Sequence, residues 1–266
     1  MKIPFTKAHG AKNDFLLTWR RDAPEQGYPA IARAICDRYT GIGADGWMLV
    51  DPPHDANAEG AIELYNSDGS APELSGNGTR CAAAFLIEHG FAPSRVRIRT
   101  GAGIKTLRLL DRQGLTFNFE MNMGKPRVVA LQFALPLSSG PRDVTLVDVG
   151  NPQCAVPVDS FDFDWRSMGA EIERHPHFPK RTNVSFIQPA DAHTIAVRFF
   201  ERGAGETNSS GTGSTGAAAA AVARGVVQSP VRVLTPAGPL EIRIQDEAFL
   251  TGPAVIIGAG EFFFDT

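Results

Sequence analysis

The most constraining feature of this sequence is a glycine- and alanine-rich stretch that occurs twice. Residues 75–90 are matched by residues 210–225, and the offset of 135 residues stays constant into the segments that follow. The correspondence also extends upstream, where residues 62–66 match residues 197–201. Two related halves are the simplest interpretation, because self-similarity at a fixed offset normally reflects a repeated structural unit.

Each copy has the pattern of a strand, a glycine loop, a helix and a second strand. A serine followed by glycine opens each predicted helix, alanine fills it, and Gly90 or Gly225 stands where a left-handed C-terminal cap belongs. Because helices that are apolar all round are normally buried, we expect each helix to be central to its own sheet. The N-terminus of such a helix, with its free backbone N–H groups and positive dipole end, suits a carboxylate or a phosphate.

Length and composition narrow the class of protein. The chain has 266 residues, of which 43% are hydrophobic, which is enough for two domains with separate cores. A net charge of −3 does not favour nucleic acid as a partner. The three cysteines, Cys36, Cys81 and Cys154, follow no disulfide or metal-binding spacing, so we expect a cytoplasmic protein without a metal. We also expect no membrane partner, since no signal peptide and no apolar run of ~20 residues is present.

The order of the predicted elements indicates an α+β fold with mixed or antiparallel sheets, because regular alternation of strands and helices is absent. We place the N-terminal domain at residues 1–122 and the C-terminal domain at residues 123–253. Residues 122–140 are punctuated by proline, glycine and serine and are interpreted as the crossing between the halves.

Two copies of one helix start suggest a single shared site. If the halves face each other across a pseudo-two-fold axis, the two helix N-termini converge on one cleft and hold a carboxylate between them. The carbon beside that carboxylate would then be flanked by equivalent residues on opposite faces. This arrangement suits inversion of a stereocentre, because one group removes a proton and the other delivers one, while the N–H groups stabilise the developing charge.

Several motifs resemble those of the diaminopimelate epimerase family. Residues 66–70 with 75–81 resemble the first signature of the family, and residues 201–207 with 210–213 resemble the second. Three shorter motifs also match, at residues 10–15, 150–152 and 181–183. The motifs occur in the family's order and cover nearly the whole chain.

The resemblance implies an isomerase that needs neither pyridoxal phosphate nor any other cofactor, and no metal. It implies two similar domains, each a sheet wrapped around a central helix, with the active site in the cleft between them and a C-terminal strand, residues 254–266, returning to the first domain. The expected substrate is a small amino diacid, LL-2,6-diaminopimelate, converted to the meso form for lysine and peptidoglycan biosynthesis. A homodimer is the assembly that the resemblance suggests.

The resemblance also assigns site residues. The expected substrate contacts are Asn13, Asn66, Asn151, Asn183, Glu201 and Arg202. The carboxylate at the reacting centre would be held by Gly76, Asn77, Gly211 and Thr212. Because Asn66, Asn183, Glu201 and Arg202 would contact the distal end, their presence favours a diamino diacid over a simple amino acid.

The departures from the family pattern lie at the catalytic centre. Ser75 and Ser210 occupy the positions of the two acid/base cysteines, and Gln153 replaces a histidine. Cys81 is not a substitute, since it matches a second, non-catalytic cysteine. A thiol with pKa ~8.5 is readily ionised at a helix N-terminus, whereas a serine hydroxyl is far less acidic and needs an adjacent base. Glu201 could be that base for Ser210, but Gln153 cannot be one for Ser75.

Three accounts stay open at this point, and we favour the first. The chain could be an active epimerase with a serine pair as its catalytic residues, supported by Glu201. It could be a relative of the phenazine-biosynthesis type that uses Glu201, Glu63 or Asp68 as a single acid/base for a proton shift. It could be a catalytically inactive paralogue that binds an amino diacid, with Ser75 and Ser210 kept as helix caps.

Overall fold

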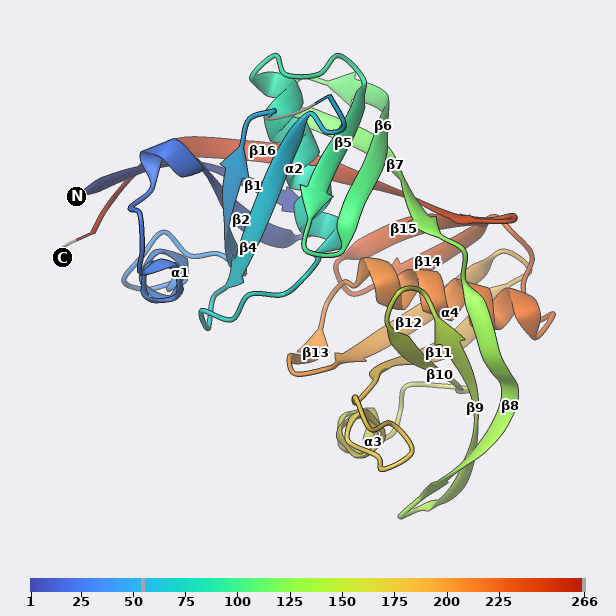
Figure 1. Cartoon of the computed structure of the whole chain (residues 1–266). Helices are drawn as coiled ribbons and strands as arrows, with labels where there is room; N and C mark the ends of the chain where they lie inside the picture. Colours follow the sequence, from blue (N-terminus) through green and yellow to red (C-terminus); the bar gives the residue numbers. More distant parts are fainter. Residues whose placement is uncertain (54–55, 265–266) are drawn as a thin grey trace. The chain divides into compact units, whose positions relative to one another are not determined.

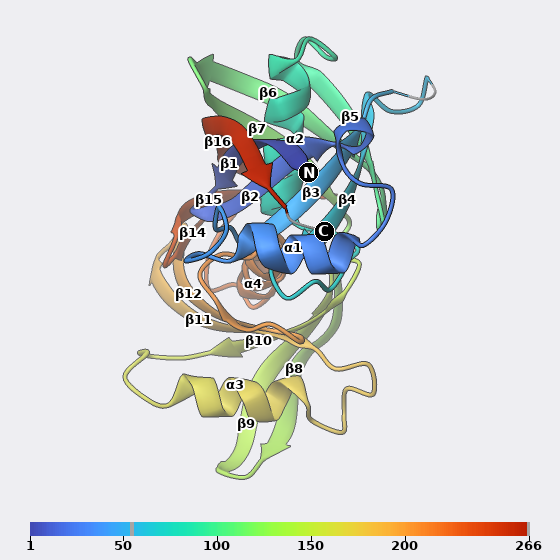
Figure 2. The same cartoon turned by 90° about the vertical axis from the view of Figure 1, so that its left-hand side faces the viewer.

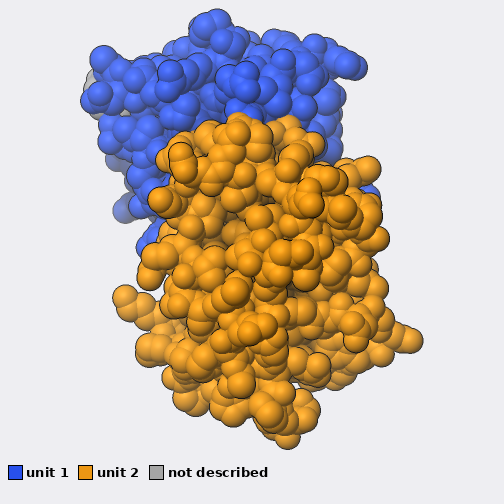
Figure 3. All heavy atoms as spheres, turned by 90° about the vertical axis from the view of Figure 1, so that its right-hand side faces the viewer, with its two compact units in different colours: residues 1–121, 252–266 blue, residues 122–251 orange. Residues whose placement is uncertain are grey.

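A computed structural model describes residues 1–53 and 56–264 and divides into two compact units (Figure 3). Unit 1 comprises residues 1–121 and 252–266, and unit 2 comprises residues 122–251. The last two positions of the predicted strand 254–266 lie outside the described residues. Each unit is a mixed sheet with few helices, as the sequence predicts (Figure 1). None of the helices within the described ranges combines the length and the apolar character that a membrane span needs.

The elements of unit 1 are β1 (Lys2–Gly10), β2 (Asn13–Trp19), η1 (Arg20–Asp22), α1 (Tyr28–Cys36), β3 (Gly46–Asp51), β4 (Gly60–Asn66), α2 (Gly76–Glu88), β5 (Arg95–Thr100), β6 (Gly103–Gln113) and β7 (Thr116–Gly124). The elements of unit 2 are β8 (Arg127–Leu137), β9 (Gly140–Asp148), β10 (Pro152–Pro157), α3 (Trp165–Glu173), β11 (Asn183–Asp191), β12 (Thr194–Glu201), β13 (Gly205–Thr207), α4 (Gly211–Ala223), β14 (Val231–Thr235) and β15 (Gly238–Ile244). The last strand, β16 (Ala248–Phe263), begins in unit 2 and ends in unit 1.

The strands of unit 1 form a closed sheet. Their order is β1-β2-β3-β4-β5-β6-β7-β16, and β16 also pairs with β1. The β2–β3 and β4–β5 pairs are parallel, because α1 and α2 connect the members of each pair. Figure 2 shows α1 and the strands of this unit from the side.

Unit 2 repeats this plan. Its strand order is β16-β15-β14-β12-β11-β10-β9-β8, with the short β13 paired to β12. Here the parallel pairs are β10–β11 and β12–β14, which are connected through α3 and α4. The succession of strand, helix and parallel strand around each glycine-rich stretch is the structural form of the sequence repeat.

The two helices α2 and α4 are confirmed with the predicted caps. Ser75 and Ser210 are the N-cap residues, and Gly90 and Gly225 adopt positive φ angles of 78° and 70° after the helix ends. Residues 76–87 of α2 are all buried, and α2 packs against β1, β2, β4 and β5. Ala217–Ala221 of α4 are buried against β9–β12 and β15, whereas Ala223 at the end of the helix is exposed. Alanine permits this, since its small side chain lets strands approach the helix closely.

A second apolar layer in each unit holds the remaining helix. In unit 1, α1 packs on β3 and β4 in a cluster that contains Trp47 and Tyr65. In unit 2, α3 contributes Trp165 to a cluster that contains Phe186 of β11. These clusters stabilise the strands, and the ends of those strands carry predicted site residues.

Residues 122–140, interpreted as the crossing between the halves, begin where unit 2 begins, and most of them form a regular strand. This segment ends β7 and forms β8, which pairs along its length with β9. Pro126 precedes β8, Pro136 lies beside the hairpin turn, and Gly140 takes a positive φ of 102° at that turn. Proline and glycine at strand ends mark the limits of a hairpin and do not interrupt its strands. At these positions no N–H group is needed for a hydrogen bond between the strands.

Candidate functional site

The helix start of unit 1 places a serine hydroxyl among backbone N–H groups. Ser75 is extended, with φ −125°, and its Oγ accepts a hydrogen bond of 3.1 Å from the N–H of Gly78. Gly76 and Asn77 form the first turn and are buried. No carboxylate among the described residues hydrogen-bonds to Ser75, so this hydroxyl lacks a neighbouring base.

Three predicted substrate contacts of unit 1 lie close to this helix start. The Asn77 Nδ2 donates to Asn13 Oδ1 at 3.2 Å, which joins α2 to the turn between β1 and β2. Asn13 Nδ2 in turn donates to Asp45 Oδ2 at 2.6 Å. Asn66, at the end of β4, donates from Nδ2 to Ser70 Oγ at 2.9 Å and thereby orders the loop that follows. The same Asp45 anchors this loop, because its carbonyl accepts the N–H of residue 67 at 3.0 Å.

Arg80 is a buried charge that the sequence did not single out as a site residue. It is 0% exposed, and its guanidinium donates to Asn77 Oδ1 and to the carbonyls of Gly76 (3.3 Å) and Pro253 (3.2 Å). No carboxylate within the described residues forms an ion pair with it. Burial lowers the pKa of Arg80 to about 10, so the group stays cationic at neutral pH. The signal in the sequence is an arginine inside an otherwise apolar helix.

The helix start of unit 2 differs by the presence of a carboxylate. Ser210, 5% exposed, accepts the N–H of Gly213 at 3.1 Å and donates its hydroxyl proton to Glu201 Oε2 at 2.8 Å. The other oxygen of Glu201 accepts a hydrogen bond of 2.6 Å from Thr207 Oγ1. The structure therefore places Glu201, the last residue of β12, directly against the serine that caps α4.

The environment of Glu201 makes it a stronger base than an exposed carboxylate. Burial of the carboxyl group is the largest influence and raises its pKa above the ordinary value, while the hydrogen bonds from Thr207 and Ser210 act in the opposite direction. A raised pKa brings a carboxylate closer to the neutral range, where a general acid or base is most effective.

Asn151, Asn183 and Arg202 also lie near one another in unit 2. Asn183 is 6% exposed, donates to the carbonyl of Pro152 at 3.1 Å and accepts the backbone N–H of Arg202 at 3.1 Å. Asn151 accepts a hydrogen bond of 2.7 Å from Gln153, which lies opposite Asn183 in the β10–β11 register. The side chain of Arg202 is exposed and bonded to a backbone carbonyl. Of the carboxylate-holding pair at this helix start, Gly211 is buried and Thr212 is partly exposed.

Gln153 is a buried amide that packs against α4 in unit 2. It is 2% exposed, and its Oε1 has no hydrogen-bond partner among the described residues. Its side chain packs against α4, where a Cβ added to Gly216 would lie 2.8 Å from Gln153 Cγ. An amide neither gains nor loses a proton near neutral pH, so Gln153 can only bind or pack.

The two other carboxylates considered as single acid/base groups are engaged elsewhere. Glu63 forms an ion pair of 2.9 Å with Arg20 and accepts a hydrogen bond from the hydroxyl of Tyr65. Asp68 accepts hydrogen bonds from the backbone and hydroxyl of Ser70, which lower its pKa. Neither contacts a helix-start serine, whereas Glu201 does.

Glu173 of α3 is a buried carboxylate that the sequence analysis missed. It is 1% exposed, accepts the N–H of Gly203 at 3.1 Å, and pairs with Arg181 and, at 3.3 Å, with Arg174. It thereby fixes the loop that follows Glu201. No sequence motif identifies it: one partner, Arg174, is its neighbour in the chain, and the others, Arg181 and Gly203, lie 8 residues and 30 residues away.

The three cysteine thiols are buried and have raised pKa values. Cys36, Cys81 and Cys154 are free and buried, and burial raises the pKa of all three thiols, to about 12 for Cys36 and for Cys81. A thiolate at these positions is therefore disfavoured. Within the described part of the chain, no three or more His, Cys, Asp and Glu side chains gather where they could hold a metal ion.

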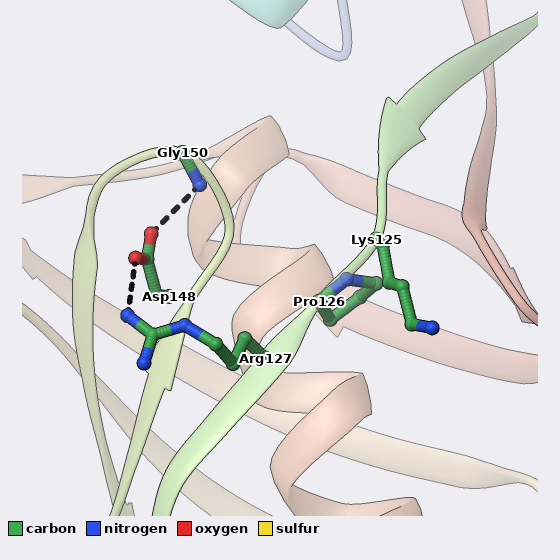
Figure 4. A pocket seen from close by; sticks show the side chains of 5 residues that line it. All are labelled: Lys125, Pro126, Arg127, Asp148 and Gly150. Atoms are coloured by element: carbon green, nitrogen blue, oxygen red, sulfur yellow. Dashed lines mark hydrogen bonds and ion pairs between the residues drawn. The ribbon is translucent and has the colours of Figure 1, made fainter.

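Two surface hollows do not contain predicted site residues. One, of about 360 Å³, lies in unit 2 between Lys125 and the Arg127–Asp148 ion pair (Figure 4). The other, of about 260 Å³, is lined by Glu59, Arg95 and Arg97. Both are open to solvent and lack the helix-start hydrogen bonds, so the geometry of the two serine caps locates the candidate site.

Comparisons with known proteins agree with this geometry. The sequence model of the diaminopimelate epimerase family matches residues 5–129 and 145–257. The diaminopimelate epimerase of Pelotomaculum thermopropionicum is 36% identical over 280 residues, which cover 98% of this chain and 99% of that protein.

Two solved structures share the fold at low sequence identity. A hydroxyproline epimerase from Agrobacterium vitis with bound trans-4-hydroxy-L-proline has a TM-score of 0.73 and 18% identity, covering 98% of this chain and 92% of the other. A phenazine biosynthesis protein from Bacillus anthracis has a TM-score of 0.74 and 14% identity, covering 99% and 100%. The family match and the 36% identity over nearly the full length carry the assignment: the chain belongs to the diaminopimelate epimerase family.

Proposed function

We propose that this chain is a cofactor-independent amino-acid epimerase that converts LL-2,6-diaminopimelate to its meso isomer by two-base proton transfer at Cα. The observation that carries the proposal is the pair of serine-capped, glycine-rich helix starts, one in each unit, with a hydroxyl among backbone N–H groups in both. Family membership supports the substrate class and a role in lysine and peptidoglycan biosynthesis. The proposal also holds that each sheet wraps around its helix and that both helix starts act on one substrate.

The first step of binding in this scheme is capture of the α-carboxylate. The groups assigned to it are Gly76, Asn77, Gly211 and Thr212, which supply N–H donors at positive helix ends. The rest of the substrate is assigned to Asn13, Asn66, Asn151, Asn183, Glu201 and Arg202. The exposed guanidinium of Arg202 suits a distal carboxylate, because its planar donors match both carboxylate oxygens.

Ser210 and Glu201 supply one acid/base group. Ser210 Oγ takes the Cα proton while its own hydroxyl proton passes to the Glu201 oxygen 2.8 Å away. The electron pair of the broken C–H bond stays on the substrate as a carbanion, whose charge spreads into the carboxylate. The raised pKa of Glu201 supports this step, since a stronger base holds the transferred proton better.

Ser75 supplies the second acid/base group, on the opposite face of the carbon. Its hydroxyl gives a proton to the carbanion, and the oxyanion that remains on Ser75 is held by the N–H of Gly78 until water reprotonates it. Because no carboxylate assists Ser75, we expect proton transfer on this face to limit the rate.

The second candidate is a proton-shifting isomerase in which Glu201 acts as the single acid/base. The raised pKa of Glu201 favours it, and Glu63 and Asp68 are bound to other partners. The structural similarity to the phenazine biosynthesis protein supports a shared fold. It gives no support for a shared reaction.

Deuterium exchange at Cα distinguishes these readings. The protein is incubated with LL-2,6-diaminopimelate in deuterated water, and both isotope content and stereochemistry are measured. A two-base epimerase gives meso product with deuterium at one centre. Ser75→Ala should abolish inversion while exchange through Ser210 and Glu201 continues. Activity that survives removal of both serines and disappears in Glu201→Gln would instead assign the single-base isomerase, and binding without exchange would assign an inactive paralogue.

Restoring cysteine at both positions tests the scaffold itself. The double variant Ser75→Cys, Ser210→Cys should raise the epimerisation rate strongly, because a thiol is far easier to ionise than a serine hydroxyl. A double variant that binds diaminopimelate and shows no rise would mean that these positions do not reach the reacting carbon.

Location and assembly complete the proposal. We place the protein in the cytoplasm, which the three free cysteines support, and assign it a homodimer by analogy with its family. Sedimentation or light scattering of the purified protein measures the assembly directly.

A further inference from the structure

Two predicted substrate contacts, Asn77 and Asn13, lie in the middle of a row of four hydrogen-bonded side chains in unit 1. Arg80 donates from its guanidinium to Asn77 Oδ1. Asn77 donates from Nδ2 to Asn13 Oδ1 at 3.2 Å, and Asn13 donates from Nδ2 to Asp45 Oδ2 at 2.6 Å. Every link therefore runs in the same direction, from arginine to carboxylate.

The two ends of the row are chemically one-sided, which means that each end either only donates or only accepts hydrogen bonds. A guanidinium can only donate hydrogen bonds and a carboxylate can only accept them, whereas a carboxamide has a donating and an accepting end of nearly the same shape. Because Arg80 only donates, Asn77 must turn its oxygen toward Arg80 and its nitrogen toward Asn13. Because Asp45 only accepts, Asn13 must turn its nitrogen toward Asp45. Both ends of the row thus demand the same rotation of both carboxamides.

Both ends are also held in place by further contacts. Arg80 is fully buried and donates to the carbonyls of Gly76 and Pro253, so its donors cannot move away from Asn77. Asp45 accepts the backbone N–H of Asp14 at 3.1 Å through the same oxygen that meets Asn13. The other oxygen of Asp45 accepts a hydrogen bond of 2.8 Å from Arg38.

We propose that Arg80 and Asp45 are positioning residues that fix the rotation of the Asn77 and Asn13 carboxamides, so that Asn13 offers an N–H group to a substrate carboxylate. The inference rests on the proposed function, which makes the two asparagines substrate contacts. In the opposite rotation Asn13 would present a carbonyl oxygen, which repels a carboxylate. The sequence motif specifies the asparagines, and the two charged ends specify which way they face.

A charge exchange within the row tests the direction of its hydrogen bonds. Asn13→Asp places two acceptor-only groups against each other at the 2.6 Å contact, so this variant should lose about 5 °C in Tm. Adding Asp45→Asn supplies a donor again at this contact, although its nitrogen no longer accepts the N–H of Asp14, so the double variant should lose clearly less Tm than the sum of the two single variants. The matched control for the second change is Asp37→Asn, which removes an exposed carboxylate that caps residues 39 and 40 and lies outside the row.

The same pair of variants separates stability from recognition. In Asn13→Asp, Asp45→Asn the row is closed again, but residue 13 now has no N–H to offer. We therefore expect KM for diaminopimelate to stay at least about tenfold above that of the wild type although part of the Tm is regained. Recovery of KM in the double variant would overturn the recognition role, and additive Tm losses of the two single variants would overturn the row. The Tm result stands even if the wild type proves inactive on diaminopimelate, so failure of the proposed function is distinguishable.

The Arg80 end is tested in the Asp45→Ala background, where position 45 no longer sets the rotation of Asn13. Arg80→Gln then replaces the donor-only end of the row by a two-sided group, and the side-chain amide signals of Asn13 and Asn77 should broaden in ¹⁵N NMR spectra as both carboxamides exchange between rotations. Arg80→Lys keeps a donor-only group and should leave these signals sharp. Equal line widths in the two folded variants would overturn the role of Arg80.

Discussion

The two serine caps allow a matched comparison, because they make the same helix hydrogen bond and differ in one partner. Ser75 Oγ and Ser210 Oγ each accept a backbone N–H at 3.1 Å, but only Ser210 also donates, to Glu201. Ser75→Ala removes a cap alone and should lower the free energy of unfolding by about 1 kcal/mol. Ser210→Ala removes a cap and a hydrogen bond to a carboxylate, worth about 1.5–3 kcal/mol more. We therefore expect Ser210→Ala to cost about 2.5–4 kcal/mol.

Urea denaturation followed by circular dichroism and tryptophan fluorescence measures both costs. A double-mutant cycle with Glu201→Gln assigns the difference. Coupling between Ser210 and Glu201 should account for most of the excess, whereas Ser75 and Glu201 should show no coupling. If Ser75→Ala and Ser210→Ala destabilise the protein equally, or if the excess persists unchanged in the Glu201→Gln background, the Ser210–Glu201 hydrogen bond does not have the strength argued from its geometry.

Three further predictions concern Glu201, the cysteines and Gly216. Because burial raises the pKa of Glu201, the folded protein holds this proton more tightly than the unfolded chain, so the free energy of unfolding should fall as pH rises from 4.5, the ordinary pKa of a glutamate carboxyl group, through the raised pKa. Glu201→Gln should lack that fall in a pH series of urea titrations, and parallel profiles would contradict it. Cys36, Cys81 and Cys154 should not react with a thiol reagent in the folded protein, whereas Ser75→Cys should add one reactive thiol; rapid labelling of the wild type under native conditions would argue against the burial described. Gly216→Ala should destabilise the protein by about 1–3 kcal/mol, because the added Cβ meets Gln153, and the loss should shrink in a Gln153→Ala background.

The repeat in the sequence was enough to predict the two buried helices and their caps. Ser75 and Ser210 precede glycine at the start of an alanine-rich run, and Gly90 and Gly225 end it, so the local rules for helix ends apply without tertiary information. The same local rules did not predict the strand within residues 122–140. Proline and glycine there mark the ends of a long hairpin, and whether such residues end a strand or interrupt a loop depends on which strand lies alongside.

Some residues of the candidate site could likewise be predicted from sequence motifs, and others could not. Motifs predicted which asparagines, glycines and serines belong to it, and Glu201 was expected beside Ser210. The carboxylate that holds the loop after Glu201, Glu173, comes from a helix with no motif of its own. Likewise, Asp45 reads as a turn former in the sequence and acquires its role only through contacts with Asn13 and with the loop after Asn66.

The sequence by itself therefore determined the repeated strand–helix–strand unit, the type of residue at each helix start and the absence of cysteine from both. Those properties depend on neighbours within a few positions along the chain. Only the tertiary structure decided that, within the described residues, Ser210 has a carboxylate partner and Ser75 has none, and that Asn13 lies between Asn77 and Asp45. The contacts of Ser210 with Glu201 and of Asn13 with Asp45 and Asn77 join residues 9, 32 and 64 positions apart, and these hydrogen bonds form only once separate elements have been brought together.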